Sequence, residues 1–181
     1  MSDNKLAEPD YNAESLTLGI VAARFNEDHV NTLLDRTVAE LRRLGVQKDR
    51  LLVKRVPGSN EIPYLCNMLA LTHEFDCLIA LGVVIAGSTS HHELIAQCTA
   101  QSLQNIGLHE CIPVINGIIT VENEDQARDR VGPPLDRGID FARAAIEMAV
   151  HKQAMHAVIE ELDDGCYEDP DEAESGGFKL N

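Results

Sequence analysis

Short apolar runs alternate with amphipathic segments along this chain. Residues 16–23 (LTLGIVAA) and 77–85 (CLIALGVVI) are nearly continuous apolar runs, which is typical of strands buried on both faces of a parallel sheet. Residues 51–56 and 113–121 are the two other predicted strands. Apolar residues recur at helical spacing between and after these runs, which predicts helices over residues 27–44, 61–71, 91–106, 124–131 and 138–161.

The alternation of strands and helices predicts an α/β fold. Its architecture would be a three-layer α/β/α sandwich around an open, four-stranded parallel sheet. The length of 181 residues suits a single domain. We place this domain at residues 16–162, after a flexible N-terminal segment, residues 1–15. Residues 163–181 are predicted to be an acidic disordered tail, because they bury too little apolar surface to offset the entropy of ordering them.

The charge of the chain excludes several classes of partner. The net charge is −15, and nucleic acids and anionic membrane surfaces both require an excess of Lys and Arg. The first residues are polar and acidic, unlike a signal peptide, and no apolar run approaches the length of a membrane span. We therefore expect a cytoplasmic protein that binds neither nucleic acid nor membrane.

The cysteines give no sign of a disulfide framework or a zinc site. They are odd in number and no two of them form a C-x-x-C motif. In a reducing compartment they are best interpreted as free thiols, most of them small core residues. The five residues are Cys66, Cys77, Cys98, Cys111 and Cys166.

The loop after the third predicted strand offers the most informative chemistry. In open parallel sheets, ligands bind beyond the carboxyl ends of the strands. Ser88 and Thr89 stand there before a helix, whose N-terminal N–H groups favour an anion, although such residues also serve as ordinary helix caps. His91 follows in the first turn, either as a proton carrier or as a surface histidine. His92 would point about 100° away, so we expect only one of the two to serve a substrate.

Other strand ends carry a ring, a carboxylate and two guanidinium groups. Phe25 could stack on a flat ligand or simply cover the end of the sheet. Glu61 begins a helix, where a carboxylate is favoured in any case. Arg130 and Arg137 could bind phosphate or form surface salt bridges. Each feature is weak alone, but their combination at one sheet edge indicates a substrate site.

At this point the chain resembles a known family. Residues 24–26 (RFN), 56–63 (VPGSNEIP) and 80–91 (ALGVVIAGSTSH) resemble blocks of the 6,7-dimethyl-8-ribityllumazine synthases. Residues 113–120, 125–127, Arg130 and 145–149 continue the match in the same order, so it covers about residues 16–150. These enzymes condense 5-amino-6-(D-ribitylamino)uracil with 3,4-dihydroxy-2-butanone 4-phosphate. The resemblance implies a flavodoxin-like fold, no cofactor, no metal, and an active site shared between neighbouring subunits.

The resemblance also implies a role for each matching residue. Phe25 would stack on the pyrimidinedione ring, and Ser59 and Glu61 would hold the uracil and the ribityl chain. The further positions that we assign to the substrate site are Asn60, Val83, Val84, Ile85, Asn116, Arg137 and Asp140.

The phosphate and proton-transfer roles fall on the third loop and on a neighbouring subunit. Ser88 and Thr89 would bind the phosphate together with Arg130 of the adjacent subunit. His91 would be the catalytic proton carrier.

Several residues depart from the pattern of the family. Asn60, Ala86 and His92 replace residue types that are usual there, and Asn116 makes the wall on the neighbour's side more polar. Residues 133–136 (PPLD) replace a Gly- and Lys-rich turn associated with members that build icosahedral shells. We therefore expect a homo-oligomer that is a pentamer or a pair of pentamers.

Two alternative functions share this type of fold. Asn60 and Asn116 would favour a non-catalytic oligomer that binds a flavin or lumazine, whereas His91, Arg130 and the phosphate loop favour the enzyme. A signalling receiver domain would need an acidic pair at the first strand end and an aspartate at the third. The chain has residues 24–26 (RFN) and 86–87 (AG) there, which excludes it.

Overall fold

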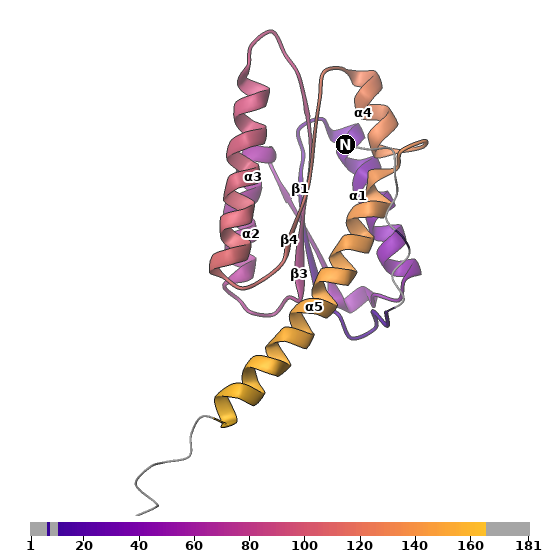
Figure 1. Cartoon of the computed structure of the whole chain (residues 1–181). Helices are drawn as coiled ribbons and strands as arrows, with labels where there is room; N and C mark the ends of the chain where they lie inside the picture. Colours follow the sequence, from indigo (N-terminus) through magenta and orange to yellow (C-terminus); the bar gives the residue numbers. More distant parts are fainter. Residues whose placement is uncertain (1–6, 8–10, 166–181) are drawn as a thin grey trace, which may run out of the picture.

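The computed structural model describes residue 7 and residues 11–165, and it contains one four-stranded parallel sheet (Figure 1). The strands lie in the spatial order β2-β1-β3-β4. They are β1 (Leu18–Ala23), β2 (Leu51–Val56), β3 (Cys77–Ile85) and β4 (Val114–Val121). The α-helices of the described residues are α1 (Glu27–Arg43), α2 (Ile62–Ala70), α3 (His91–His109), α4 (Glu124–Val131) and α5 (Arg137–Gly165). Two short 3₁₀ helices, η1 (Lys48–Arg50) and η2 (Ser59–Glu61), precede β2 and α2.

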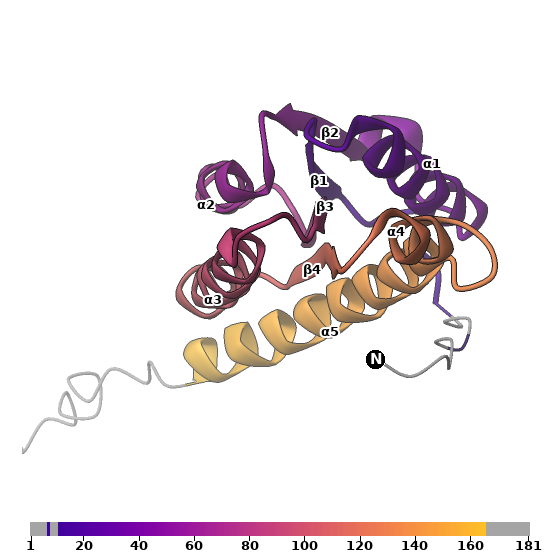
Figure 2. The ribbon, with the colours of Figure 1, turned by 90° about the horizontal axis from the view of Figure 1, so that it is seen from above.

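Helices cover both faces of the sheet. α2 and α3 lie on one face, and α1, α4 and α5 lie on the other (Figures 1 and 2). This is the three-layer α/β/α sandwich of a flavodoxin-like fold, and the predicted fold class is confirmed. None of the helices in the described part of the chain is both long and apolar enough to span a membrane.

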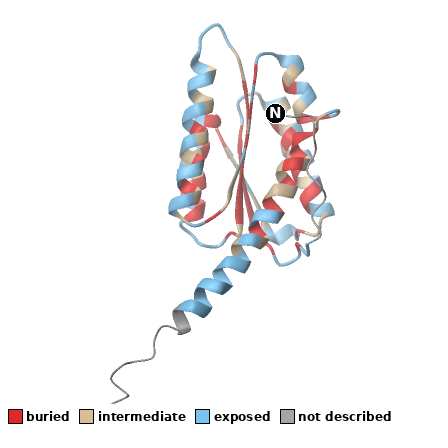
Figure 3. Cartoon of the chain, viewed as in Figure 1, coloured by how far each residue is buried: buried red, intermediate tan, exposed pale blue. Residues whose placement is uncertain are grey.

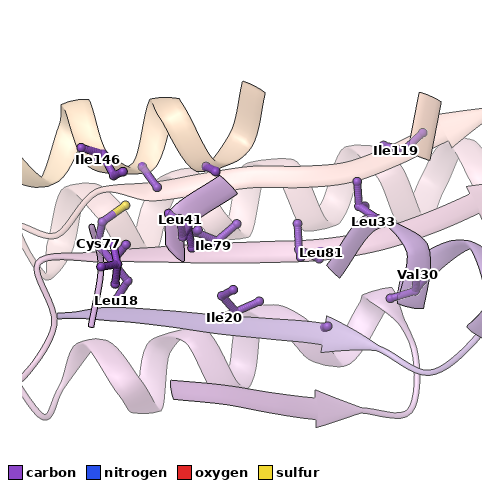
Figure 4. Close-up of a cluster of buried hydrophobic side chains, with 14 of the residues drawn as sticks. Leu18, Ile20, Val30, Leu33, Leu41, Cys77, Ile79, Leu81, Ile119 and Ile146 are labelled. Atoms are coloured by element: carbon purple, nitrogen blue, oxygen red, sulfur yellow. The ribbon is translucent and has the colours of Figure 1, made fainter. Parts of the chain in front are cut away.

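The two central strands hold the core together. Every residue of β1 is buried, and so is every residue of β3 except the last (Figure 3). Ile20 and Ile79 face a cluster that includes Leu33 of α1 and Ile146 of α5 (Figure 4). Val21, the next residue of β1, belongs instead to the cluster beneath α2 and α3. Successive side chains of a strand thus enter opposite cores, which explains the unbroken apolar runs in the sequence.

The strand register brings four loops to one edge of the sheet. Ala23 pairs with Val56 across β1 and β2, and Ile85 pairs with Val121 across β3 and β4. All strands are parallel, so the loops that follow them open at the same edge, at the top of Figure 1. This is the edge where the sequence places the substrate site.

Two helices extend further than predicted. α3 continues through Gly107 to His109 instead of ending at Ile106. A glycine inside a helix lowers the stability of the helix by about 1 kcal/mol relative to alanine. At Gly107 the missing side chain leaves space for the segment that leads into β4. A Cβ at Gly107 would lie 3.1 Å from the carbonyl oxygen of Ile112. α5 continues to Gly165, past the predicted end at residue 161.

The ends of the domain are only partly described. Ala13 is completely buried although it lies in the segment that we predict to be flexible. Residues 163–165 belong to α5, whereas the rest of the predicted acidic tail lies outside the described residues. The domain limits at residues 16 and 162 therefore stay a prediction.

A buried carboxylate joins α1 to α5. Glu40 is 6% exposed and accepts hydrogen bonds from Arg43 Nε at 2.7 Å, Arg43 Nη2 at 2.8 Å and Arg143 Nε at 2.8 Å. The hydrogen bonds from Arg43, and then those from Arg143, outweigh burial and lower the pKa of Glu40 to about 2 from 4.5. The charged carboxylate therefore stabilises the folded state.

We predict that Glu40→Gln lowers the free energy of unfolding by about 2 kcal/mol at pH 7, because two guanidinium groups lose their carboxylate. The stabilisation is complete above pH 4.5 and is lost as the pH falls towards the folded-state pKa of about 2. The difference between variant and wild type should therefore shrink below pH 4.5 in urea unfolding. Asp35→Asn, at an exposed position of the same helix, is the matched control. An equal loss in both variants would contradict the role of Glu40.

Candidate active site

The loop after β1 presents an aromatic ring at the edge of the sheet. The backbone N–H groups of Arg24 and Phe25 donate to the carbonyls of Val56 and Pro57 at 2.8 and 3.0 Å. Asn26 has a left-handed backbone (φ 57°), and its Nδ2 donates to the carbonyl of Val83 at 2.8 Å. The loop is thus held from both sides, while the Phe25 ring is 72% exposed. A ring held in this way can stack on a flat ligand.

The loop after β2 packs closely against a glycine of β3. Ser59 and Asn60 lie in η2, and the Glu61 carboxylate accepts from the backbone N–H of Gly58 at 2.8 Å. Ser59 is buried against Gly82 of β3, where a Cβ would come within 2.5 Å of the serine Oγ. The sequence prediction missed Gly82. An isolated glycine inside an apolar strand is a signal of such close approach.

The loop after β3 leads to the N-terminus of α3. Ser88, Thr89 and Ser90 are exposed, and α3 begins at His91. Ser90 is the N-cap residue, but its side chain makes no capping hydrogen bond. A Cβ at Gly87 would meet no atom within 4 Å, so this part of the loop faces open space. Helix N–H groups together with hydroxyl groups beside open space are suited to an anion such as phosphate.

These three loops enclose one cavity with a volume of about 870 Å³. This volume falls within the usual range for small-molecule sites. The cavity is lined by ten of the predicted site residues, namely Phe25, Ser59, Asn60, Glu61, Val83, Val84, Ile85, Ser88, Thr89 and His91. The sequence therefore identified most of the wall that a single protomer provides.

The cavity also contains residues that the prediction missed. Leu94, Ile95 and Cys98 of α3 line it beside His91. Their spacing of three, four and seven residues from His91 places them on one helical face, a pattern that the sequence already contained. His92 lines the cavity too, although it was expected to point about 100° away from His91. That only one of the two histidines serves a substrate stays a prediction. The His92 Nδ1 lies 3.0 Å from the Thr89 carbonyl oxygen, which orients its ring.

Four predicted site residues lie outside this cavity. Asn116 is exposed in β4, opposite Ala80 of β3, and its Oδ1 accepts from the backbone N–H of Ile118 at 3.1 Å. Arg130 of α4 donates to the carbonyl of Gln126 at 3.2 Å.

The other two form an ion pair inside the protomer. Arg137 and Asp140 are 7% and 6% exposed, and Arg137 Nη1 lies 2.8 Å from Asp140 Oδ2. A single chain thus does not bring any of these four residues to its own cavity. Their assignment to the substrate site stays a prediction.

The arrangement suits a substrate with a flat ring and a second substrate with an anionic group. The ring of Phe25 offers a stacking surface, the loop at residues 87–90 offers anion binding, and His91 can transfer a proton between them. Among the described residues, no group of three or more His, Cys, Asp or Glu side chains is placed to hold a metal ion.

Comparison with known proteins gives a consistent result. The sequence model of the family described as 6,7-dimethyl-8-ribityllumazine synthase matches residues 15–153. The chain is 44% identical over 142 residues to the 6,7-dimethyl-8-ribityllumazine synthase of Paraburkholderia phytofirmans, covering 78% of this chain and 83% of that protein. It is 42% identical to the protein of the same name from Azoarcus sp. strain BH72, covering 78% and 89% of the two chains. The relative from Cupriavidus pinatubonensis is 42% identical over 81% of this chain and 86% of its own length. The chain therefore belongs to the 6,7-dimethyl-8-ribityllumazine synthase family.

Proposed function

We propose that the protein is a lumazine synthase of riboflavin biosynthesis. It condenses 5-amino-6-(D-ribitylamino)uracil with 3,4-dihydroxy-2-butanone 4-phosphate and releases 6,7-dimethyl-8-ribityllumazine, phosphate and water. The observation that carries this proposal is the single cavity that joins an exposed ring, an anion-binding loop and an imidazole, in a chain of this family.

The uracil substrate binds at the β1 and β2 loops. Its flat ring stacks on Phe25, whose own backbone is fixed by hydrogen bonds to the β2 loop. Ser59 and Glu61 line the same cavity as Phe25. In this proposal they contact the uracil and the ribityl chain. Val83, Val84 and Ile85 at the end of β3 supply an apolar surface in the same cavity.

The phosphate of the second substrate binds at the start of α3. Ser88 and Thr89 are exposed beside the open space at Gly87, and the helix N-terminus favours the negative charge. An arginine would neutralise more of that charge. We propose that Arg130 of an adjacent subunit supplies it, since Arg130 does not line the cavity of its own chain.

His91 transfers protons during the reaction. The amine of the uracil attacks the ketone and forms an imine with loss of a water molecule, and phosphate is then eliminated. The second amine attacks the remaining carbonyl, and loss of a second water completes the second ring of the product. Each step moves a proton, and one imidazole can assist several of them. Alignment of two substrates in one cavity supplies most of the rate gain, since it removes the entropic cost of a bimolecular reaction.

The proposed site is complete only in an oligomer. We infer that the protein is a homopentamer or a pair of pentamers and that it works in the cytoplasm. Its substrates, the ribitylaminouracil and the butanone phosphate, are small soluble molecules. A non-catalytic flavin-binding oligomer is not favoured, because the phosphate loop and His91 lie together in the cavity. A binder that only holds a flavin needs neither of them.

We predict that His91→Ala lowers turnover about tenfold without abolishing it, because substrate alignment remains. Steady-state assays of the purified variant with both substrates, following the fluorescent product, measure this change. His92→Ala is the matched control, because His92 lines the same cavity but is oriented by the Thr89 carbonyl, and its turnover should change less. Complete loss of turnover in a folded His91→Ala variant would refute the proposal that substrate alignment supplies most of the rate gain and His91 a smaller part.

We predict that Arg130→Ala raises the Michaelis constant for the butanone phosphate about tenfold and leaves that for the ribitylaminouracil nearly unchanged. Arg128→Ala is the control, since Arg128 lies on the same helix but is exposed and pairs with Asp125 at 3.0 Å. Equal effects of the two substitutions on the phosphate substrate would rule out a specific role for Arg130.

A further inference from the structure

The backbone that carries the Phe25 ring is held by an arginine that does not line the cavity. Arg55 of β2 directs its guanidinium group towards the end of β1, where Nη2 donates to the carbonyl of Ala23 at 2.8 Å. Its Nη1 donates to Oδ1 of Asn31, in the second turn of α1, at 2.6 Å. One side chain of the neighbouring strand thus joins the strand before the β1 loop to the helix after it.

The strand register explains how Arg55 reaches both partners. It pairs with Ala22 across β1 and β2, one residue before Ala23. Val56, the next residue of β2, belongs to the core cluster beneath α2 and α3. Successive side chains of a strand alternate between its faces, so Arg55 lies on the face that α1 covers. Both acceptors are neutral, and the contact therefore depends on the fork of the guanidinium group rather than on an ion pair.

The position of the Phe25 ring depends on this backbone. The ring is 72% exposed, so side-chain packing does little to fix it. Hydrogen bonds to the β2 loop and to β3 hold residues 24–26. Arg55 holds the chain on either side of these residues, at Ala23 and at Asn31. A segment that is held along its length and at both ends has little freedom to lose when a ligand stacks on the ring.

We propose that Arg55 is a positioning residue for the substrate that stacks on Phe25. It touches no substrate, but it holds the ring in place before the ribitylaminouracil arrives. Binding then requires less ordering of the protein, and a substrate that binds elsewhere in the cavity is not affected. The inference rests on the proposed function, because in that proposal the uracil stacks on this ring.

Arg55→Met tests this role, because methionine keeps an apolar stem but removes both donors. We expect the Michaelis constant for the ribitylaminouracil to rise about tenfold and that for the butanone phosphate to stay nearly unchanged. Arg50→Met is the matched control. Arg50 joins the segments that lead into β1 and β2, since its Nη1 donates to the carbonyl of Ser15 at 2.9 Å and to Oγ1 of Thr17 at 3.2 Å. These contacts lie at the opposite edge of the sheet, away from the cavity.

The pattern of the Michaelis constants separates positioning from a general loss of structure. Arg50→Met should leave both constants unchanged. A purely structural role of Arg55 would lower the amount of active enzyme, and hence the maximal rate, without changing either constant. An unchanged constant for the ribitylaminouracil in Arg55→Met, or an equal rise for both substrates or in both variants, would overturn the proposal. Circular dichroism checks that the variants are folded.

A double-mutant cycle tests whether Arg55 acts through the ring. In a Phe25→Ala background, Arg55→Met should change the Michaelis constant for the ribitylaminouracil by less than about twofold, because the ring that it positions is absent. A further tenfold rise in this background would mean that the two residues act independently, and it would refute the proposal.

A fluorescent reporter tests the same inference without the reaction. The chain contains no tryptophan, so Phe25→Trp places a single indole at the position of the ring. Adding Arg55→Met should lower the fluorescence anisotropy of this indole in the absence of any substrate, whereas adding Arg50→Met should not. An anisotropy that Arg55→Met leaves unchanged would contradict the positioning role. Absence of product formation by the wild type would instead contradict the proposed function, so the two failures can be told apart.

Discussion

β1 and β3 lie side by side at the centre of the sheet, and helices cover both of their faces. Their backbones pair from Leu18 opposite Cys77 to Ala22 opposite Leu81. Slipping by one residue would send every core side chain to the wrong face, so the register is strongly determined. The hydrogen bond from Asn26 to the Val83 carbonyl extends this pairing into the cavity wall. The position of the Phe25 ring relative to the phosphate loop is therefore a consequence of core packing.

The fold could be predicted from the sequence because each element has its own local pattern. The apolar runs of β1 and β3 and the helical spacing of α1 follow from which faces are buried. The contacts that were missed join segments far apart in the chain. The close approach of Ser59 to Gly82 depends on the spatial neighbourhood of η2 and β3, which local spacing cannot give. Leu94, Ile95 and Cys98 were missed for a different reason. Their spacing from His91 was visible, but the direction of that helical face depends on how α3 docks.

The two candidate arginines, Arg130 and Arg137, differ in the free-energy cost of turning towards a ligand. Arg137 is buried in an ion pair with Asp140, and turning it towards a ligand would break this buried pair. Arg130 is only partly buried and donates to a backbone carbonyl of its own helix. Arg130 can therefore turn towards a phosphate on a neighbouring subunit at a smaller cost in free energy. Arg137 is better placed to hold the start of α5 in position.

The α5 helix reaches from the carboxyl edge of the sheet to the opposite edge and beyond it. Its first turn packs against α1, where a Cβ at Gly138 would lie 3.0 Å from the carbonyl oxygen of Leu33. Lys152 contacts the loop that precedes β3, at the amino end of that strand. Between the first turn of α5 and Lys152, Arg143 forms an ion pair with Glu40 of α1. The packing of α5 therefore links α1 on one side of the domain to the loop that precedes β3 on the other.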